Sequence, residues 1–321
     1  MLSDIKARVI GGSDITRDEA LYLINETDLG ELTEASHEIT EKCASADFDL
    51  CSIINSKSGN CTEDCKWCAQ SSHATCEIKT YDLADAQTCL EQAVYNEKKG
   101  VHRFSLVNSG RKPSDDEIDK ICEIYETIGK NSRISLCASL GLCSKEQLSR
   151  LYKAGVRRYH CNLESSPNYF KELCTTHTQE QKITTLLHAR EVGMELCSGG
   201  IVGMGESRED RVDMALELRK LGVKSVPMNI LHPLKGTALE HMEFMQDDEI
   251  LRTVAVYRFI LPDAYLRLAG GRSLIGDECV NRALYAGINS ALVGDMLTTV
   301  GANIDQDKER FRKANYNIRA Y

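Results

Sequence analysis

The sequence has no run of about 18 consecutive apolar residues, the length that a membrane-spanning helix requires. Its first residues, Met1 to Arg8, contain no sustained apolar stretch of the kind that directs secretion. Basic residues are in deficit, because the net charge is −9 and the sequence pI is near 5.5. We therefore expect a cytoplasmic protein without a broad surface for nucleic acid, although single basic residues can still line an anionic pocket.

Two further features are missing, a low-complexity linker and a second C-x-x-C pair. The 321 residues, 42% of them hydrophobic, can bury a substantial core, and the absence of a linker favours one large domain. Structural zinc sites usually combine two C-x-x-C halves, so zinc is a weak explanation for the 14 cysteines. In a reducing compartment we expect thiols or metal ligands rather than disulfides, and their abundance indicates a low-oxygen cell.

The most informative stretch is Cys61-Thr-Glu-Asp-Cys65-Lys-Trp67-Cys68, in which three cysteines are separated by three and then two residues. Three thiolates can hold three irons of a 4Fe–4S cluster and leave the fourth iron open. This pattern is typical of radical S-adenosylmethionine (AdoMet) enzymes, in which the open iron binds AdoMet and an electron cleaves it to a 5'-deoxyadenosyl radical. Trp67 is then expected beside the adenine, although an aromatic packing under the loop is the simpler alternative.

The rest of the chain alternates short apolar runs with amphipathic helices. Residues 1–46 are expected to form a helical extension, with a capping box at Thr16 to Glu19, and residues 47–321 the main domain. The predicted strands are Asp49–Asn55, His102–Val107, Arg133–Ala138, Arg157–Leu163, Glu195–Val202, Lys224–Ile230, Ala264–Leu268 and Ile288–Leu292. Helices are predicted near residues 83–98, 115–129, 145–154, 179–192, 207–221, 247–259 and 277–286. Eight strands alternating with helices predict an α/β fold, the closed parallel (β/α)8 barrel of TIM type.

Chemistry-bearing residues follow the predicted strands, where such barrels place their active sites. The cysteine loop follows the first strand, Cys137 ends the third, and Arg267 lies on the seventh. The fourth strand ends in residues 160–164 and the fifth in a glycine-rich segment that starts at Cys197. The sequence therefore predicts one site at the mouth of the barrel.

Six blocks of this chain, in the same order and at similar intervals, resemble the biotin synthase family. They are Cys61–Ser72, Asn162–Phe170, Cys197–Glu206, Ser225–Leu239, Tyr265–Arg272 and Leu297–Thr299. The resemblance implies that dethiobiotin is converted to biotin with AdoMet as the radical source, and that a second, auxiliary iron–sulfur cluster supplies the sulfur. It also implies a homodimer and an electron-transfer protein of flavodoxin or ferredoxin type.

The family builds its auxiliary cluster from three cysteines and an arginine, and one of these positions differs here. The matching residues are Cys137, Cys197 and Arg267, but the second-strand cysteine is replaced by Ser105, a poor ligand for iron. We therefore expect an altered cluster held by Cys51, Cys137 and Cys197, with Arg267 nearby or ligating, that contains more iron and carries an extra sulfide. The competing ligand is Cys161, which should point outward if Asn162 and Glu164 point inward. Small buried hydrophobes are expected at Cys43, Cys89, Cys122, Cys143, Cys174 and Cys279.

Ligand contacts follow from the same resemblance. It implies that Asn162 and Glu164 bind the AdoMet ribose, Ile201 the adenine, and Asn108 with Ser109 the methionine moiety. It further implies that dethiobiotin is read by residues of three segments, Asn162, Asn229 and the pair Thr298 and Thr299. His177 stands where many relatives have arginine, and the sequence leaves its role open.

Two alternative functions remain at this stage. One is a related radical AdoMet barrel, such as a methylornithine synthase or a hydrogenase maturase. The other is a non-catalytic iron–sulfur protein, which would need no AdoMet pocket.

Overall fold

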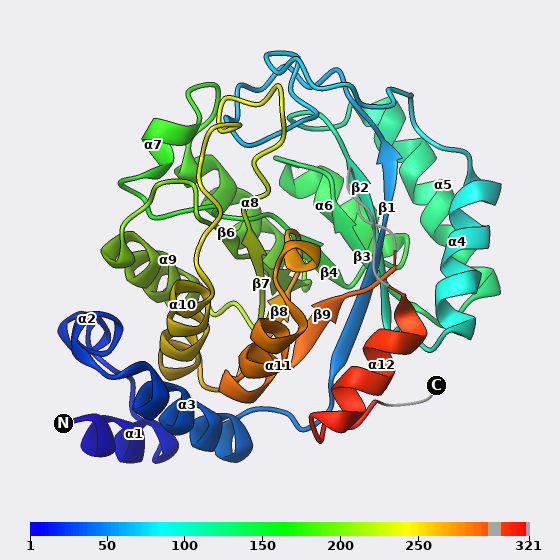
Figure 1. The fold of residues 1–321 in the computed structure, drawn as a ribbon. Coiled ribbons are helices and arrows are strands. Elements are labelled where there is room, and N and C mark those ends of the chain that lie inside the picture. The colour runs from blue at the N-terminus through cyan, green and yellow to red at the C-terminus, as the bar shows by residue number, and fades with distance from the viewer. Residues whose placement is uncertain (295–302, 319–321) are drawn as a thin grey trace.

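A computed structural model of the chain, which describes residues 1–294 and 303–318, contains one closed parallel barrel surrounded by helices (Figure 1). The strands pair in the order β5-β4-β3-β2-β1-β9-β8-β7-β6, and a β5–β7 pairing closes the barrel. The strands are β1 Asp49–Lys57, β2 Arg103–Asn108, β3 Ser135–Ser139, β4 Arg158–His160, β5 Glu195–Cys197, β6 Gly200–Val202, β7 Ser225–Ile230, β8 Tyr265–Leu268 and β9 Ser290–Leu292. The predicted (β/α)8 fold is confirmed.

One predicted strand, Glu195–Val202, is interrupted and forms β5 and β6. Between the two segments the backbone passes so close to β7 that a Cβ on Gly199 would lie 1.9 Å from the carbonyl oxygen of Pro227. A Cβ on Gly200 would lie 2.4 Å from the carbonyl oxygen of Glu164. Glycine is therefore required at both positions by the packing of the barrel itself.

The predicted helices also form. They are α1 Leu2–Ile10, α2 Arg17–Glu26, α3 Leu29–Cys43, α4 Ala86–Lys98, α5 Asp115–Asn131, α6 Lys145–Lys153, α8 Gln179–Glu191, α9 Arg208–Lys220, α10 Asp247–Ile260 and α11 Asp277–Ala286. The capping box at Thr16 and Glu19 is present. The sequence analysis does not predict the short helix α7 Phe170–Leu173, the 3-10 turn η1 Arg272–Leu274 or α12 Ile304–Lys313.

The two ends of the barrel differ in their covering. Helices α1 to α3 lie at the end where the strands begin, with α3 against α10 and α11 and α2 against α9 (Figure 1). The start of β1 is also held by the C-terminal segment, since Phe48 stacks on Phe311 at 4.0 Å and its N–H donates to the carbonyl of Asn317. The opposite end carries the loop that follows β1, which contains Cys61, Cys65 and Cys68. No helix within residues 1–294 and 303–318 has both the length and the apolar character needed to cross a membrane.

A fully buried arginine, Arg258 of α10, ties that helix to two barrel segments. Its guanidinium donates to the carbonyl groups of Leu261, Pro262, Ala264 and Gly287 and to the side chain of Asn289. We expect Arg258→Met to lower the free energy of unfolding by about 3 kcal/mol, because several buried acceptors lose their donor. Urea unfolding would measure the loss. The control Arg252→Met removes one hydrogen bond, to Thr27, and an equal loss in both variants would contradict this role for Arg258.

Candidate active site

A cavity of about 380 Å³ opens at the carboxyl-terminal end of the barrel strands. It brings together the predicted site residues Cys51, Cys61, Cys65, Trp67, Cys68, Asn108, Ser109, Cys137, Asn162, Glu164, Cys197, Ile201, Asn229 and Arg267. Ser105, Cys161 and His177 also line it. Thr298 and Thr299 lie outside the described residues. The sequence therefore predicted the lining of one cavity from segments that are far apart in the chain.

The cysteine loop is folded back on itself, so its three thiols face this cavity. The N–H of Cys61 donates to the carbonyl of Gln70, and the N–H of Ser72 returns to the carbonyl of Cys61. A tight turn closes the loop, with the N–H of Cys68 donating to the carbonyl of Cys65. Burial raises the pKa of Cys68 to about 11, so this thiol needs a metal to hold it as a thiolate. Three clustered thiols of this kind fit a cluster that takes three cysteine ligands.

The polar residues expected around AdoMet have defined geometry. The side-chain carbonyl of Asn162 accepts from the N–H of Gly199, and its amide donates to Glu164 at 3.3 Å. Glu164 has φ of 71°, an uncommon left-handed conformation for a residue other than glycine. Strain of this kind persists where surrounding structure imposes it, often at a binding site. Ile201 and Trp67 both pack against a small apolar cluster that includes Leu173 and Leu231.

Asn229 of β7 is fixed by the backbone on both sides. Its amide donates to the carbonyl of Gly200 at 3.1 Å, and its oxygen accepts from the N–H of Gly270 at 2.8 Å. An amide has two donors and two acceptor sites, so one of each stays available to a ligand in the cavity. Asn108 and Ser109 are also held, by Ser56 and by the carbonyl of Gly59.

Three buried cysteines from three strands line the cavity together with Arg267 of β8. They are Cys51 on β1, Cys137 on β3 and Cys197 on β5, with Arg267 Nη1 3.6 Å from the sulfur of Cys197. Burial raises the pKa of Cys137 to about 12, and the nearby thiols of Cys51 and Cys197 act in the same direction. The structure thus groups the three thiols and the arginine that the sequence analysis assigned to an auxiliary cluster.

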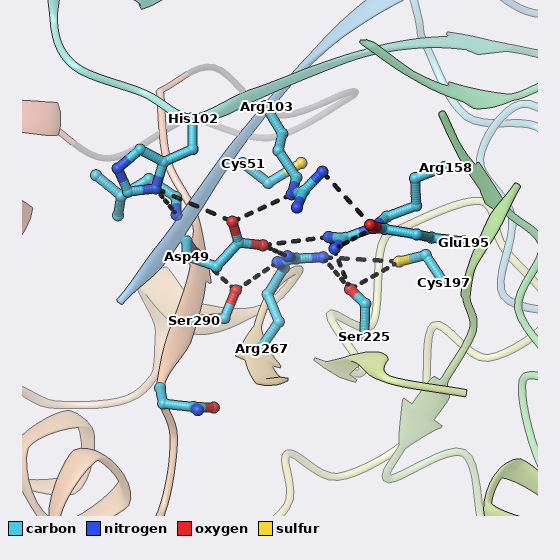
Figure 2. Close-up of polar contacts among 12 residues, drawn as sticks. Asp49, Cys51, His102, Arg103, Arg158, Glu195, Cys197, Ser225, Arg267 and Ser290 are labelled. Carbon is cyan, nitrogen blue, oxygen red and sulfur yellow. Dashed lines mark hydrogen bonds and ion pairs between the residues drawn. The ribbon is translucent and has the colours of Figure 1, made fainter. Parts of the chain in front are cut away.

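A layer of arginines lies around these thiols, and Figure 2 shows three of them converging on Asp49. Asp49 accepts from Arg267 at 2.6 Å, from Arg103 at 3.1 Å and from Arg158 at 3.2 Å. Burial would raise the pKa of Asp49, but these arginines outweigh burial and lower it. Arg158 also pairs with Glu195, whose side chain is 58% exposed. Three cations therefore face two carboxylates, and the remaining positive charge suits an anionic thiolate-ligated cluster.

Among Cys51, Cys137 and Cys197, only Cys197 has a lowered pKa. His160 Nδ1 lies 3.4 Å from its sulfur, and the Ser225 hydroxyl donates to that sulfur at 3.3 Å. Burial alone would raise its pKa, but His160, Arg267 and Arg158 lower it to about 6. The thiolate, which is the metal ligand, is therefore favoured near neutral pH.

Cys51 and Cys161, the two competing candidates for the third cysteine of this group, have different surroundings. The side chains whose charges act on the Cys51 thiol include Arg267, Asp49 and Cys197. Those that act on the Cys161 thiol are Lys182 and Glu164. Cys161 belongs to the apolar core and also borders the cavity. The alternation argument itself does not hold, because β4 ends at His160 and does not extend to Leu163 as predicted.

Replacing Asp49 by asparagine is expected to lower the free energy of unfolding by about 3 kcal/mol in the metal-free protein, because the arginines of this layer lose their buried counter-charge. Chemical denaturation of both proteins would measure it. Asp263→Asn is the matched control, since its pair with Lys224 is exposed and should contribute less than about 1 kcal/mol. Equal effects of the two substitutions would rule out the structural importance of the Asp49 pairs.

The site and the fold can now be compared with known proteins. The Radical SAM superfamily model matches residues 55–218, and the Biotin and Thiamin Synthesis associated domain matches residues 227–317. A biotin synthase of Parabacteroides distasonis is 45% identical over 317 residues, which cover 99% of this chain and 97% of the relative. That of Porphyromonas gingivalis is 47% identical over 318 residues, 99% of this chain and 96% of the relative. This chain belongs to the biotin synthase family.

Solved structures with the same fold are more distant from this member of the biotin synthase family. Methylornithine synthase superimposes with a TM-score of 0.82 at 19% identity, covering 97% of this chain and 95% of that protein. The FeFe-hydrogenase maturase of Carboxydothermus hydrogenoformans has a TM-score of 0.82 at 17% identity, covering 98% and 78%. At such identities the likeness establishes the barrel alone. Membership of the Radical SAM superfamily implies a 4Fe–4S cluster and AdoMet.

One cysteine was assigned wrongly from the sequence. Cys174 is not a buried hydrophobe remote from the barrel mouth, because its sulfur lies 3.7 Å from that of Cys65. The segment between β4 and α8 folds back over the cysteine loop, and the N–H of Thr175 donates to Asp64 at 2.9 Å. The same prediction is confirmed for Cys89, Cys143 and Cys279, which are buried in the apolar core, whereas Cys43 and Cys122 are partly buried and pack against it.

Asp49 and the arginines that pair with it were also missed from the sequence. Asp49, Arg103 and Arg158 look like ordinary surface charges when the sequence is read alone. The available signal was their position, because Arg158 and His160 are two residues apart on β4 and so share a face of the strand. Charged residues on the inner face of a closed barrel need partners there.

Proposed function

We propose that this protein inserts one sulfur atom into dethiobiotin to give biotin. The observation that carries the proposal is the single cavity that joins the cysteine loop to Cys51, Cys137, Cys197 and Arg267. When bound, the two clusters would supply an electron that cleaves AdoMet to a hydrogen-abstracting radical, and a sulfur that joins the substrate carbon. An enclosed barrel keeps water from such radicals.

At the cavity mouth, the chain would hold AdoMet by its three parts. Cys61, Cys65 and Cys68 would hold the cluster to which the methionine end binds. Asn162 and Glu164 would accept the ribose hydroxyls, and Trp67 and Ile201 would flank the adenine. Asn108 and Ser109 would meet the methionine amine and carboxylate. Two cations that line this region, Arg111 and Lys182, would balance the negative charge of the carboxylate.

Dethiobiotin would lie between the two clusters, oriented by amides. Asn229 and Asn162 would read the ureido ring, whose donor and acceptor edges match the groups that an amide offers. Thr298 and Thr299 would bind the substrate carboxylate. The fixed orientation of Asn229 supports this role, because a pre-set amide loses little freedom on binding.

The auxiliary cluster would be held by Cys51, Cys137 and Cys197, with Arg267 beside it or ligating it. Its type is proposed to differ from the usual two-iron form, because Ser105 takes the place of one cysteine and Cys51 enters from a different strand. Ser105 is already engaged with the backbone, with its hydroxyl 3.4 Å from the carbonyl oxygen of Leu106. The positive layer formed by Arg103, Arg158 and Arg267 would stabilise the anionic cluster.

Family membership supports two further proposals. We propose that it is a cytoplasmic homodimer. We further propose that a small electron-transfer protein of flavodoxin or ferredoxin type reduces the cluster on Cys61, Cys65 and Cys68.

The activity is tested by anaerobic incubation of the reconstituted protein with AdoMet, a strong reductant and dethiobiotin. Mass spectrometry would quantify 5'-deoxyadenosine and biotin, with iron and sulfide counted beforehand. We expect both products and more iron than one 4Fe–4S cluster contains. Formation of 5'-deoxyadenosine without biotin would refute sulfur insertion, and failure to cleave AdoMet would refute radical chemistry.

A further inference from the structure

A second group of metal-ligating side chains lies beside the cysteine loop and shares one residue with it. The ligand atoms of Cys65, Cys174 and His177 all lie within 4.8 Å of one another. The two sulfurs are 3.7 Å apart, and the sulfur of Cys174 lies 3.8 Å from His177 Nε2 and 3.3 Å from Nδ1, the nitrogen that contacts Glu63. In a tetrahedral zinc site the metal–ligand bonds are about 2.3 Å to sulfur and about 2.0 Å to nitrogen, so two sulfurs lie about 3.8 Å apart and sulfur and nitrogen about 3.6 Å apart. The spacing here suits one small ion.

His177 is oriented for such an ion by a buried carboxylate. Its Nδ1 lies 2.6 Å from Oε2 of Glu63, a residue that is only 6% exposed. The hydroxyl of Thr176 donates to the same oxygen at 2.9 Å. A carboxylate that accepts from one ring nitrogen fixes the tautomer and leaves the other nitrogen free to bind metal. Glu63 therefore presents the lone pair of His177 Nε2 as a ligand.

Asp64 supplies the rigidity of the site. Its Oδ1 lies 3.3 Å from the sulfur of Cys174 and accepts from the N–H groups of Thr175 and Thr176. These bonds hold the segment carrying Cys174 and His177 against the cysteine loop. Two sulfurs and one imidazole form a ligand set suited to the borderline divalent ions Zn²⁺, Co²⁺ and Fe²⁺, with a water molecule as the fourth ligand.

We propose that the cluster-free protein binds one divalent transition-metal ion at Cys65, Cys174 and His177. Binding displaces the protons of the two thiols and transfers no electron. Because Cys65 is needed by the cluster, the ion and the 4Fe–4S cluster exclude each other, and zinc bound here blocks cluster assembly. The inference rests on one part of the proposed function, that Cys65 is a ligand of the 4Fe–4S cluster. It does not require that the protein inserts sulfur into dethiobiotin.

Anaerobic titration of the cluster-free full-length protein with Co²⁺ tests the site. We expect one equivalent to bind, with thiolate-to-cobalt charge-transfer absorption and the strong visible bands of tetrahedral cobalt. Cys174→Ala and His177→Ala should each weaken binding at least tenfold, and Glu63→Gln by about 10- to 100-fold. Cys61→Ala and Cys68→Ala are matched controls that keep the proposed ligands and should bind cobalt normally. Absence of cobalt binding would overturn the proposal. So would loss of binding in the two controls with retention in Cys174→Ala, since the ion would then lie on the cluster ligands.

A second measurement uses assembly itself. One equivalent of Zn²⁺ added before iron and sulfide should suppress the rise of cluster absorption in the unmodified protein. The same zinc should have little effect on Cys174→Ala, which keeps all three cluster cysteines. Circular dichroism would verify folding, and Cys174→Ser offers a second variant of similar size. If zinc suppressed the rise of cluster absorption equally in the unmodified protein and in the folded variants, the proposal that an ion at this site excludes the cluster would be wrong.

Discussion

Replacing Cys51 by serine is expected to remove the auxiliary iron and to lower biotin formation at least about a hundredfold, while AdoMet cleavage continues. Loss of an outer partner of a metal ligand already costs 10- to 100-fold in affinity or activity, and a ligand should matter more. The thiol of Cys51 lies in the group around Arg267, away from the cysteine loop. Iron analysis, together with quantitation of 5'-deoxyadenosine and biotin, would measure the three effects.

Cys161→Ser is the matched control for this substitution, because Cys161 is also buried and borders the same cavity. Its electrostatic neighbours are Lys182 and Glu164, so we expect this variant to keep its full iron content. If Cys51→Ser retained the auxiliary iron and Cys161→Ser lost it, the assignment of ligands would be reversed.

Replacing Cys68 by alanine is expected to have a still larger effect, reducing both products to background. Two thiols cannot hold the three irons that position the fourth, so AdoMet would have no cluster to bind. The auxiliary iron on Cys51, Cys137 and Cys197 should remain, and iron analysis would detect it. Cys89→Ala, in the apolar core, should keep both products. Continued AdoMet cleavage by Cys68→Ala would contradict the assignment of the cysteine loop.

The contrast between these two variants separates the two halves of the site. Loss at Cys68 should abolish AdoMet cleavage, whereas loss at Cys51 should leave 5'-deoxyadenosine and remove biotin. A pattern in which both variants lost both products, with folding intact, would mean that the two groups of cysteines do not act as separate centres.

Much of the fold follows from the sequence because its determinants are local. Helix caps such as Thr16 and Ser114 and the regular alternation of apolar runs determine where elements begin, and closure of eight parallel strands follows from their number. The break between β5 and β6 did not follow, since it depends on the approach of Gly199 to Pro227 across the barrel. The helix α12 was missed in a polar segment, because its apolar contact is the distant residue Phe48.

The site was predictable to the extent that residues at strand ends must converge. Cys51, Cys137, Cys197 and Arg267 meet because the strands that carry them are parallel and register with one another. Cys174 was not predictable, because its position depends on an irregular segment held by hydrogen bonds to Asp64. Pairing among buried charges, such as Asp49 with Arg267, likewise becomes visible only when the tertiary structure is known.

The source of the inserted sulfur tests the central claim most directly. The protein would be reconstituted with iron and with sulfide enriched in a heavy sulfur isotope, freed of unbound sulfide, and allowed one turnover with dethiobiotin. The account predicts that the biotin formed carries the heavy isotope, and that Cys51→Ser forms no such product. Biotin containing sulfur of natural abundance would contradict the proposal that a cluster held by Cys51, Cys137 and Cys197 donates the sulfur.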